Sequence, residues 1–380
     1  MNRKMGRSYL IKNGSILSIE TGELIRKDIL IERGLILAVE EELWPEPGTE
    51  VINAKDMLIT PGWLDAHAHV YQGSGTIGVA TDSMAEGGVT FVADAGTAGA
   101  CNFEDLRERF MGRSLIRVKA YLNIAKWGIS TSHGELQNLD NIDFTACEEM
   151  CGRYPDEIVG LKARIDPRVC SDGEVTLKSL RELGDRCKKP VVVHASRSGL
   201  PMAEILSYLK ANDIFAHSYA NQLPGLLSTD GTVKQEVQDA RNRGVIFDLS
   251  HGSSNFSFEV ARKAIEQDFV VDMISTDLHR GSNARVIDMA STMTKMLHLG
   301  LSLPEVIKRV TLFPARILAV GECAGPLVPG SPADLTVFRL TDGRFLMSDS
   351  DGSSEWVSRK IESVYTFLGD RMFFHNSIPN

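Results

Sequence analysis

The chain has 380 residues, of which 43% are hydrophobic and 24% are charged, and its formal net charge is −9. These values are typical of a soluble globular protein with one large and one small domain, or with two medium ones. The negative charge argues against a general nucleic-acid binder, and no run approaches the roughly 18 apolar residues of a membrane span.

The first 60 residues predict a small β unit. Its first ten residues have no apolar core, so we expect no secretory signal peptide. Segments 9–17 and 28–39 alternate loosely between apolar and polar residues and contain the turn pairs Asn-Gly and Arg-Gly. Short apolar runs at 51–52 and 57–59 add two strands, which are too few to close a core.

The missing strands are expected at the other end of the chain. Segments 332–338 and 361–373 are strand-like and follow a Pro- and Gly-rich join at 325–332. We therefore predict a small β-sandwich domain assembled from both termini, residues 1–60 plus 325–380, beside a larger domain of residues 61–324.

Eight β-rich runs alternate with helical segments in the larger domain. Several runs are almost continuously apolar, as expected for parallel strands buried on both faces. This pattern predicts an α/β fold, a (β/α)8 TIM barrel; a doubly wound sheet is the alternative, but no Gly-x-Gly-x-x-Gly follows the first strand. The runs are 63–69, 89–94, 115–123, 158–165, 191–194, 214–217, 245–249 and 272–277.

The first of these runs contains Asp65-Ala-His-Ala-His69. Alternate residues of a strand face the same side, so the two histidines can bind one divalent metal. TIM-barrel enzymes carry their chemistry at the carboxyl ends of the strands. Four of the nine histidines, a lysine and an aspartate fall at such ends and predict one divalent metal or a pair: His67, His69, Lys162, His194, His217 and Asp277.

This set resembles the binuclear metal site of the amidohydrolase superfamily in its order, its strand assignment and its flanking split β domain. Further stretches resemble the dihydroorotase-related amidohydrolase/deacetylase branch of that superfamily. Members of the branch are similar to enzymes that deacetylate N-acetyl-D-amino acids or acetyl-(R)-mandelate. These stretches are 94–102, 127–129, 159–164, 247–252 and 274–277.

The resemblance implies a metal-dependent hydrolase with two divalent metal ions, zinc by expectation. His67, His69 and Asp277 would hold the more buried ion, and His194 and His217 the more exposed one. Histidine and carboxylate sites accept several divalent ions, so the sequence does not fix the metal.

Lys162 would bridge the two ions as a lysine N-carboxylated by CO2. An ordinary ammonium beside two dications is strongly disfavoured, which agrees with such a conversion. The resemblance further implies a metal-bridging hydroxide that attacks an amide or ester carbonyl, with Asp277 as the catalytic residue that passes a proton to the leaving group.

Cationic side chains near the predicted barrel mouth indicate a small, anionic, acylated substrate that carries a carboxylate. Arg164 shares the inward face of its strand with Lys162, and Arg is suited to bind a carboxylate with two hydrogen bonds. His279 follows the eighth strand, and His251 ends the seventh, where it could contact substrate or support the site. Other arginines at these ends are better explained by ion pairs with nearby acidic residues: Arg168, Arg197 and Arg285.

Four alternatives to a deacetylase share features of this site. A lactonase or phosphotriesterase would have the same ligand set, but the stretches given above disfavour it. A cyclic amidase of the dihydroorotase or hydantoinase type would use the same metals. A deaminase of the cytosine or adenosine type is disfavoured, because deaminases resemble single-metal sites that lack the lysine of the fourth strand, and Lys162 is present here. A non-catalytic scaffold is disfavoured because every predicted metal ligand is present. Six cysteines without paired spacing favour a reducing cytoplasm. We expect no nucleic-acid or membrane partner; oligomers are common in the superfamily, but no stretch identifies an interface.

Overall fold

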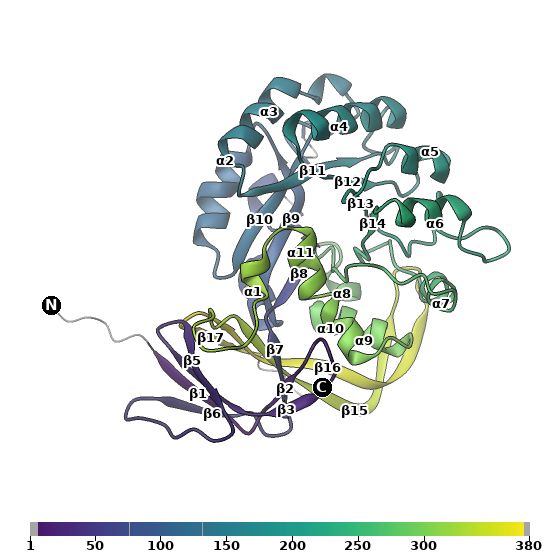
Figure 1. Ribbon diagram of the computed structural model, residues 1–380. Coiled ribbons are helices and arrows are strands. Elements are labelled where there is room, and N and C mark those ends of the chain that lie inside the picture. Colours follow the sequence, from purple (N-terminus) through teal and green to yellow (C-terminus); the bar gives the residue numbers. More distant parts are fainter. Residues whose placement is uncertain (1–6, 76, 131, 376–380) are drawn as a thin grey trace.

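A parallel sheet of seven strands positions most of the predicted site residues. The computed structural model describes residues 7–75, 77–130 and 132–375 (Figure 1). The strand order is β14-β13-β12-β11-β10-β9-β8, so each strand pairs with the next one along the chain. The strands are β8 (Trp63–Ala68), β9 (Val89–Gly99), β10 (Arg117–Asn123), β11 (Ile158–Arg164), β12 (Val191–His194), β13 (Ile214–Phe215) and β14 (Ile246–Phe247).

Segment 272–278 joins the two edges of this sheet. Met273 forms a parallel bridge with Asp248, just beyond β14, and Leu278 forms one with Ala68 of β8. The backbone N–H of Asp277 also donates to the carbonyl of His67 at 2.6 Å. The segment has no continuous strand, contrary to the prediction for 272–277, because its pairing is limited to these isolated bridges. The result is a TIM-barrel-like α/β fold, as predicted.

Helices cover the outside of the curved sheet (Figure 1). Several begin at an acidic or hydroxyl residue whose side chain accepts a backbone N–H; Asp143, Asp172, Asp288 and Ser302 do so. The α-helices are α1 (Thr81–Glu86), α2 (Phe103–Asp105), α3 (Phe144–Arg153), α4 (Gly173–Cys187), α5 (Met202–Ser207), α6 (Gln235–Asn242), α7 (Phe258–Ile265), α8 (Asn283–Val286), α9 (Met289–His298), α10 (Leu303–Lys308) and α11 (Leu312–Ile317).

Short helical turns complete this layer. They are η1 (Gln72–Ser74), η2 (Leu106–Phe110), η3 (Met111–Arg113), η4 (Leu139–Asn141) and η5 (Gly321–Cys323). Within the described ranges, none of the helices combines the length and the apolar character that crossing a membrane requires.

The two chain ends build two further sheets. One has the order β5-β4-β1-β6, and the other has the order β17-β16-β15-β7-β2-β3, in which β15 pairs with β7. Tyr9 and Ile29 of the first sheet share a buried cluster with Ile59 and Leu335 of the second. The strands are β1 (Ser8–Lys12), β2 (Ser15–Leu17), β3 (Leu24–Arg26), β4 (Asp28–Glu32), β5 (Leu35–Glu40), β6 (Glu50–Asn53), β7 (Leu58–Pro61), β15 (Leu335–Ser348), β16 (Ser354–Leu368) and β17 (Arg371–Phe374).

Strands from both termini thus pair within one sheet. The predicted division into a β-sandwich domain of residues 1–60 plus 325–380 and a barrel domain of residues 61–324 stays a prediction.

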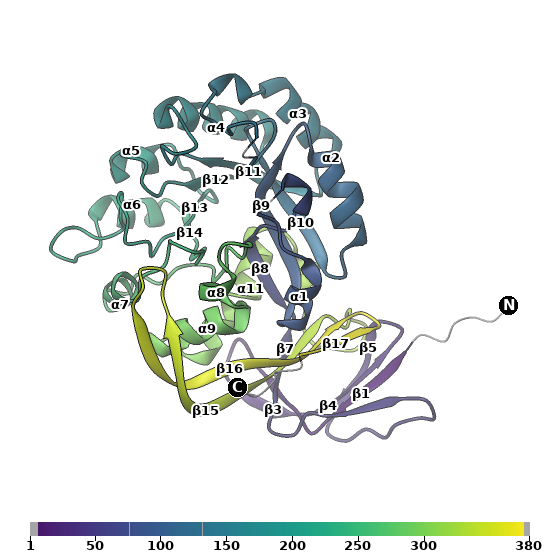
Figure 2. The ribbon, with the colours of Figure 1, turned by 180° about the vertical axis from the view of Figure 1, so that it is seen from behind.

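The β15–β16 hairpin is longer than the sequence indicated. Pairing continues from Leu335 opposite Phe367 to Ser348 opposite Ser354, through a register shift near Asp342. The far half of the hairpin leaves the terminal sheet and runs to α7 and α9 of the barrel layer (Figure 2). There Glu355 accepts from Arg262 and His298, both at 2.7 Å. The predicted strands 332–338 and 361–373 cover only part of β15 and β16, and the second also includes most of β17.

Candidate metal centre

Side chains from the ends of two strands, β8 and β11, lie close to the carboxylate of Asp277. Nε2 of His69 lies 3.2 Å from Oδ1 of Asp277, and Nε2 of His67 lies 3.8 Å from the same oxygen. Nζ of Lys162, which enters from β11, is 3.4 Å from Nε2 of His67. All four residues are buried. The predicted ligands of β8 and β11 are therefore neighbours of the predicted ligand of the barrel-closing segment.

The two remaining predicted ligands lie against this group. The ring of His217 is centred 5.3 Å from that of His67 and 4.2 Å from that of His194. One ligand atom each from His67, His217 and Asp277 lie within 4.8 Å of one another, close enough for these three residues to hold one metal ion.

Three of the histidines have a protein partner at Nδ1. Nδ1 of His69 is 2.6 Å from Oγ1 of Thr97, Nδ1 of His67 is 3.0 Å from Oγ of Ser250, and Nδ1 of His217 is 2.7 Å from the carbonyl oxygen of Ser250. Nε2 of His217 is buried, and no residue that the structure describes bonds to it. Metal-bound histidines are oriented in this way, so the residues fit a divalent cation.

The protonation states suit the same role. Burial lowers the pKa of His217 to about 3 and the pKa values of His67 and His194 well below their usual range, which keeps these rings neutral. Burial opposes the ionisation of Asp277, but the hydrogen bond from His69 favours the carboxylate, and the pKa lies well below its usual range. Neutral imidazoles and an ionised carboxylate are the forms that bind metals.

Lys162 is the unusual member of the group because it is a lysine, an ordinarily exposed residue, and only 1% of it is exposed. Burial lowers the pKa of its ammonium to about 8, against the opposing attraction of Asp277 and Asp248. The side chain runs past Gly96, where a Cβ would lie only 2.7 Å from the Cβ of Lys162. A glycine in this place leaves room for the lysine stem beside β9.

A buried carboxylate fixes the segment that carries Asp277. Asp65 accepts from the backbone N–H of Thr276 at 3.1 Å and from the Thr276 hydroxyl at 2.5 Å. Asp277 itself has a φ of +47° and His217 a φ of +63°, conformations that non-glycine residues seldom adopt. Asp65 therefore helps to hold Asp277 in a strained position at the site.

The supporting residues Thr97, Asp248 and Ser250 were not predicted. Asp248 accepts from the hydroxyls of Ser250 and Ser275, and Oδ2 of Asp248 is also 3.4 Å from Nδ1 of His67. All three residues lie within the stretches 94–102 and 247–252 that carried the family resemblance. The available signal was a polar residue inside an otherwise apolar strand end.

The predicted substrate residues have different surroundings. Arg164 forms a two-pronged ion pair with the buried Glu135, through Nε at 2.8 Å and through Nη2. Both residues line a cavity of about 250 Å3 together with Ile129, Ser130, Gly134, Gln137, Arg168 and Val169. The ring of His279 is centred 6.1 Å from that of His69. Substrate binding by Arg164 and His279 stays a prediction.

The contacts of His251 are those of a residue that supports the site. It is fully buried, its Nδ1 lies 2.9 Å from the carbonyl oxygen of Gly252, and its Nε2 lies 2.9 Å from Nζ of Lys295. Both ring nitrogens are thus engaged within the protein. These contacts favour the supporting role that the sequence left open over direct contact with a substrate.

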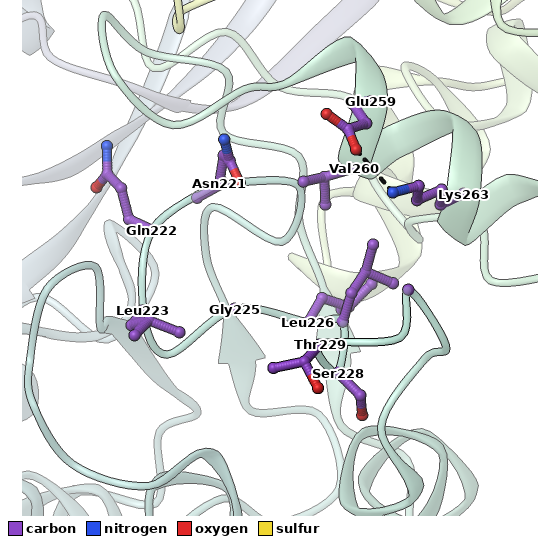
Figure 3. A pocket seen from close by; sticks show the side chains of 13 residues that line it. Asn221, Gln222, Leu223, Gly225, Leu226, Ser228, Thr229, Glu259, Val260 and Lys263 are labelled. Carbon is purple, nitrogen blue, oxygen red and sulfur yellow. Dashed lines mark hydrogen bonds and ion pairs between the residues drawn. The ribbon is translucent and has the colours of Figure 1, made fainter.

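Of the three arginines expected to form ion pairs, Arg168 and Arg197 have an acidic partner, and Arg285 is instead bound by backbone carbonyls. Arg168 is paired with Asp166, Arg197 lies 3.8 Å from the same carboxylate, and Arg285 donates to two backbone carbonyls. A separate cavity of about 180 Å3 lies between segment 220–231 and α7, where Glu259 and Lys263 pair at 2.7 Å (Figure 3). None of the predicted metal ligands lines it.

Comparison with known proteins identifies a family of hydrolases that this chain matches. The model of the family described as the amidohydrolase family matches residues 58–366. A protein named a deacetylase, from Agrobacterium fabrum, is 33% identical over 348 residues, which are 90% of this chain and 85% of that protein.

Two solved structures have nearly the same fold. One, described as a dihydroorotase, has a TM-score of 0.89 and 31% identity and covers 97% of each chain. The other, described as an adenine deaminase, has a TM-score of 0.88 and 28% identity and covers 97% of this chain and 100% of its own. The resemblance predicted from the sequence motifs is confirmed.

Proposed function

The chain belongs to the amidohydrolase family, and we propose that it is a deacetylase-like, metal-dependent hydrolase that cleaves an acyl bond, amide or ester, of a small carboxylate-bearing substrate. The observation that carries this proposal is the group of imidazoles around Asp277. Three of them are held at Nδ1 by protein partners, and the buried Nε2 of His217 has no partner among the described residues.

We propose that these residues hold two divalent ions, zinc by preference. His67, His69 and Asp277 would bind one ion, His194 and His217 the other, with Lys162 between them as its N-carboxylated form. Support for that form comes from the complete burial of Lys162, which disfavours its ammonium beside cations. When bound, such ions lower the pKa of a water molecule and polarise a carbonyl group.

Asp277 is the residue proposed to move the proton. Its Oδ1 faces His69 and its low pKa keeps it ionised, so it can accept one proton from the attacking water. It then returns that proton to the nitrogen or oxygen that leaves as the acyl bond breaks. The chain of events needs no serine or cysteine nucleophile.

Arg164 is proposed to bind the carboxylate of the substrate. Glu135 accepts from Nε and Nη2 of Arg164, so Nη1 is the donor that this ion pair does not use. Glu135 also holds the pKa of Arg164 up, against the opposing effect of burial. A charged guanidinium fixed in this way is preorganised for an anion.

A cyclic amidase is the second candidate, because a structure described as a dihydroorotase matches over 97% of the chain at 31% identity. The deaminase description of the other structure is less favoured, since Lys162 suits a two-metal site. The two amidase candidates differ in their substrates alone, so an assay of cyclic amides beside N-acyl amino acids and acyl hydroxy acids separates them.

The test of the proposal combines metal analysis with turnover. Zinc-loaded protein is expected to hold about two ions per chain and to hydrolyse members of the N-acyl or O-acyl panel. Asp277→Asn should keep the protein folded but abolish turnover, and Lys162→Ala should lose metal and regain partial activity with added short carboxylic acids. His298→Gln, which removes a histidine that pairs with Glu355 outside the centre, is the control.

Full turnover by a metal-replete Asp277→Asn variant would exclude the proton transfer. Unchanged metal content in Lys162→Ala would exclude the lysine bridge. Absence of metal and of turnover in the wild-type protein would favour the scaffold alternative.

A further inference from the structure

The loop after β14 approaches the carboxylate of Asp277 at Gly252. The backbone N–H of Gly252 donates to the carbonyl of Thr276 at 2.9 Å, which places the two loops side by side. A Cβ at Gly252 would lie less than 3.0 Å from Oδ2 of Asp277. The backbone of Gly252 therefore limits where this carboxylate can rest, without any side chain between them.

Two side chains hold Gly252 in place by its carbonyl oxygen. Nδ1 of His251 lies 2.9 Å from this oxygen, and Oγ of Ser350 donates to it at 3.0 Å. Ser350 lies in the turn between β15 and β16, at the far end of the long hairpin (Figure 2). Its own backbone N–H donates to the carbonyl of Phe256 at 2.8 Å. The hairpin tip thus forms part of the wall behind the candidate centre.

Lys295 of α9 holds the other nitrogen of His251. Its Nζ donates to Nε2 of His251 at 2.9 Å and to the carbonyl of Arg285 at 2.7 Å. An ammonium has only donors, so Nε2 must accept and the ring proton must be on Nδ1. That is the tautomer which can donate to the carbonyl of Gly252. The ring of His251 also stacks on Phe256 at 4.5 Å.

The charge of Lys295 is not needed for the reaction proposed above, and its burial has a cost. Only 1% of the residue is exposed, and burial lowers its pKa to about 8, although Asp349 and Asp288 attract the ammonium. A lysine in such a place needs a structural or functional reason. Among the contacts of the described residues, the pairing with His251 is the one that leads towards Asp277.

We propose that Lys295 and Ser350 are positioning residues for Asp277, and that they act through the His251–Gly252 peptide rather than by touching the carboxylate. This proposal depends on the proposed function only because one of its two tests measures the kcat of the proposed hydrolysis. Lys295 selects the tautomer of His251, and Ser350 supplies the second donor to Gly252. Together they make the hairpin of the terminal sheet a part of the active-site wall.

The kinetic test uses Ser350→Ala and Lys295→Met, each measured with metal content and thermal stability. Both should lower kcat about tenfold with KM within about twofold and wild-type metal content, since loss of a supporting hydrogen bond costs about 10- to 100-fold at such sites. Ser350→Thr keeps the hydroxyl and should restore kcat. Ser353→Ala, an exposed residue of the same turn, is the matched control and should leave kcat unchanged.

A second measurement does not depend on turnover. In protein with 15N-labelled histidine, the His251 resonances should show the Nδ1–H tautomer in the wild type and a mixture or the Nε2–H form in Lys295→Met. This result stands even if no substrate is found, so a failure of the proposed function is distinguishable from a failure of the positioning proposal. An unchanged tautomer in Lys295→Met, or wild-type kcat in Ser350→Ala, would overturn the proposal.

Discussion

Replacing Gly252 with alanine is the sharpest test of the geometry around Asp277. The new methyl carbon would stand less than 3.0 Å from Oδ2 of Asp277 and 3.2 Å from Nδ2 of Asn255. Because the carboxylate is the free end of a side chain whereas Gly252 is held by its backbone, the carboxylate is the part that must retreat, by about 1 Å. A displacement of that size costs about 100-fold in kcat.

Alanine at this position would also strain the backbone. The φ of Gly252 is +55°, so the substitution should cost about 1–2 kcal/mol of folding stability even without a clash. Gly48→Ala separates the two effects, because Gly48 has a φ of +92° and nothing within 4 Å of its added Cβ. The control should lose stability and keep its kcat.

The assay is steady-state hydrolysis of the best acyl substrate by zinc-loaded protein, with metal content and unfolding measured on the same samples. Gly252→Ala should show the fall in kcat at wild-type metal content in its folded fraction. A kcat within twofold of the wild type would refute the argument that Gly252 sets the position of the carboxylate.

Three further predictions follow from single contacts. Thr97→Val removes the partner of Nδ1 of His69 and should weaken metal binding about 10- to 100-fold, measured by competition with a chelating dye; unchanged affinity would contradict the orienting role. Arg164→Gln should raise KM about tenfold or more for a carboxylate substrate but not for its methyl ester, and it should destabilise the fold because Glu135 loses its partner. Lys295 has a folded-state pKa of about 8 against an ordinary 10.5, so the unfolded chain binds more protons between these values, and stability should rise with pH across this window by up to about 3 kcal/mol relative to Lys295→Met. Parallel pH profiles of the two proteins in chemical unfolding would exclude this linkage.

Most of the ligand set could be predicted from local patterns. His67 and His69 alternate on a strand, and the remaining candidates stand at the carboxyl ends of apolar runs, where barrel enzymes carry their chemistry. These rules need only the strand period and the order of the runs. They indicate which side chains can lie together at the carboxyl end of the barrel, and the structure places those side chains within a few ångströms of each other. Their role as metal ligands stays a prediction.

The supporting contacts could not be predicted in the same way. The partner of His67 is Ser250, 183 residues later, and the partner of Gly252 is Ser350, 98 residues later. Serine has no local pattern that separates a supporting hydroxyl from a surface one. Such pairs exist only because the barrel closes and the hairpin crosses its outer layer.

The sequence by itself determined the order of the strand-and-helix units, the family and the residues that gather at the strand ends, since these depend on local periodicity and residue type. Only the tertiary structure decided which groups hold those residues. It placed His251 in a buried pair with Lys295, paired Arg164 with Glu135, and brought the hairpin tip behind Asp277. The physical reason is that burial and hydrogen-bond partnership are properties of the packed chain, whereas alternation is a property of each segment.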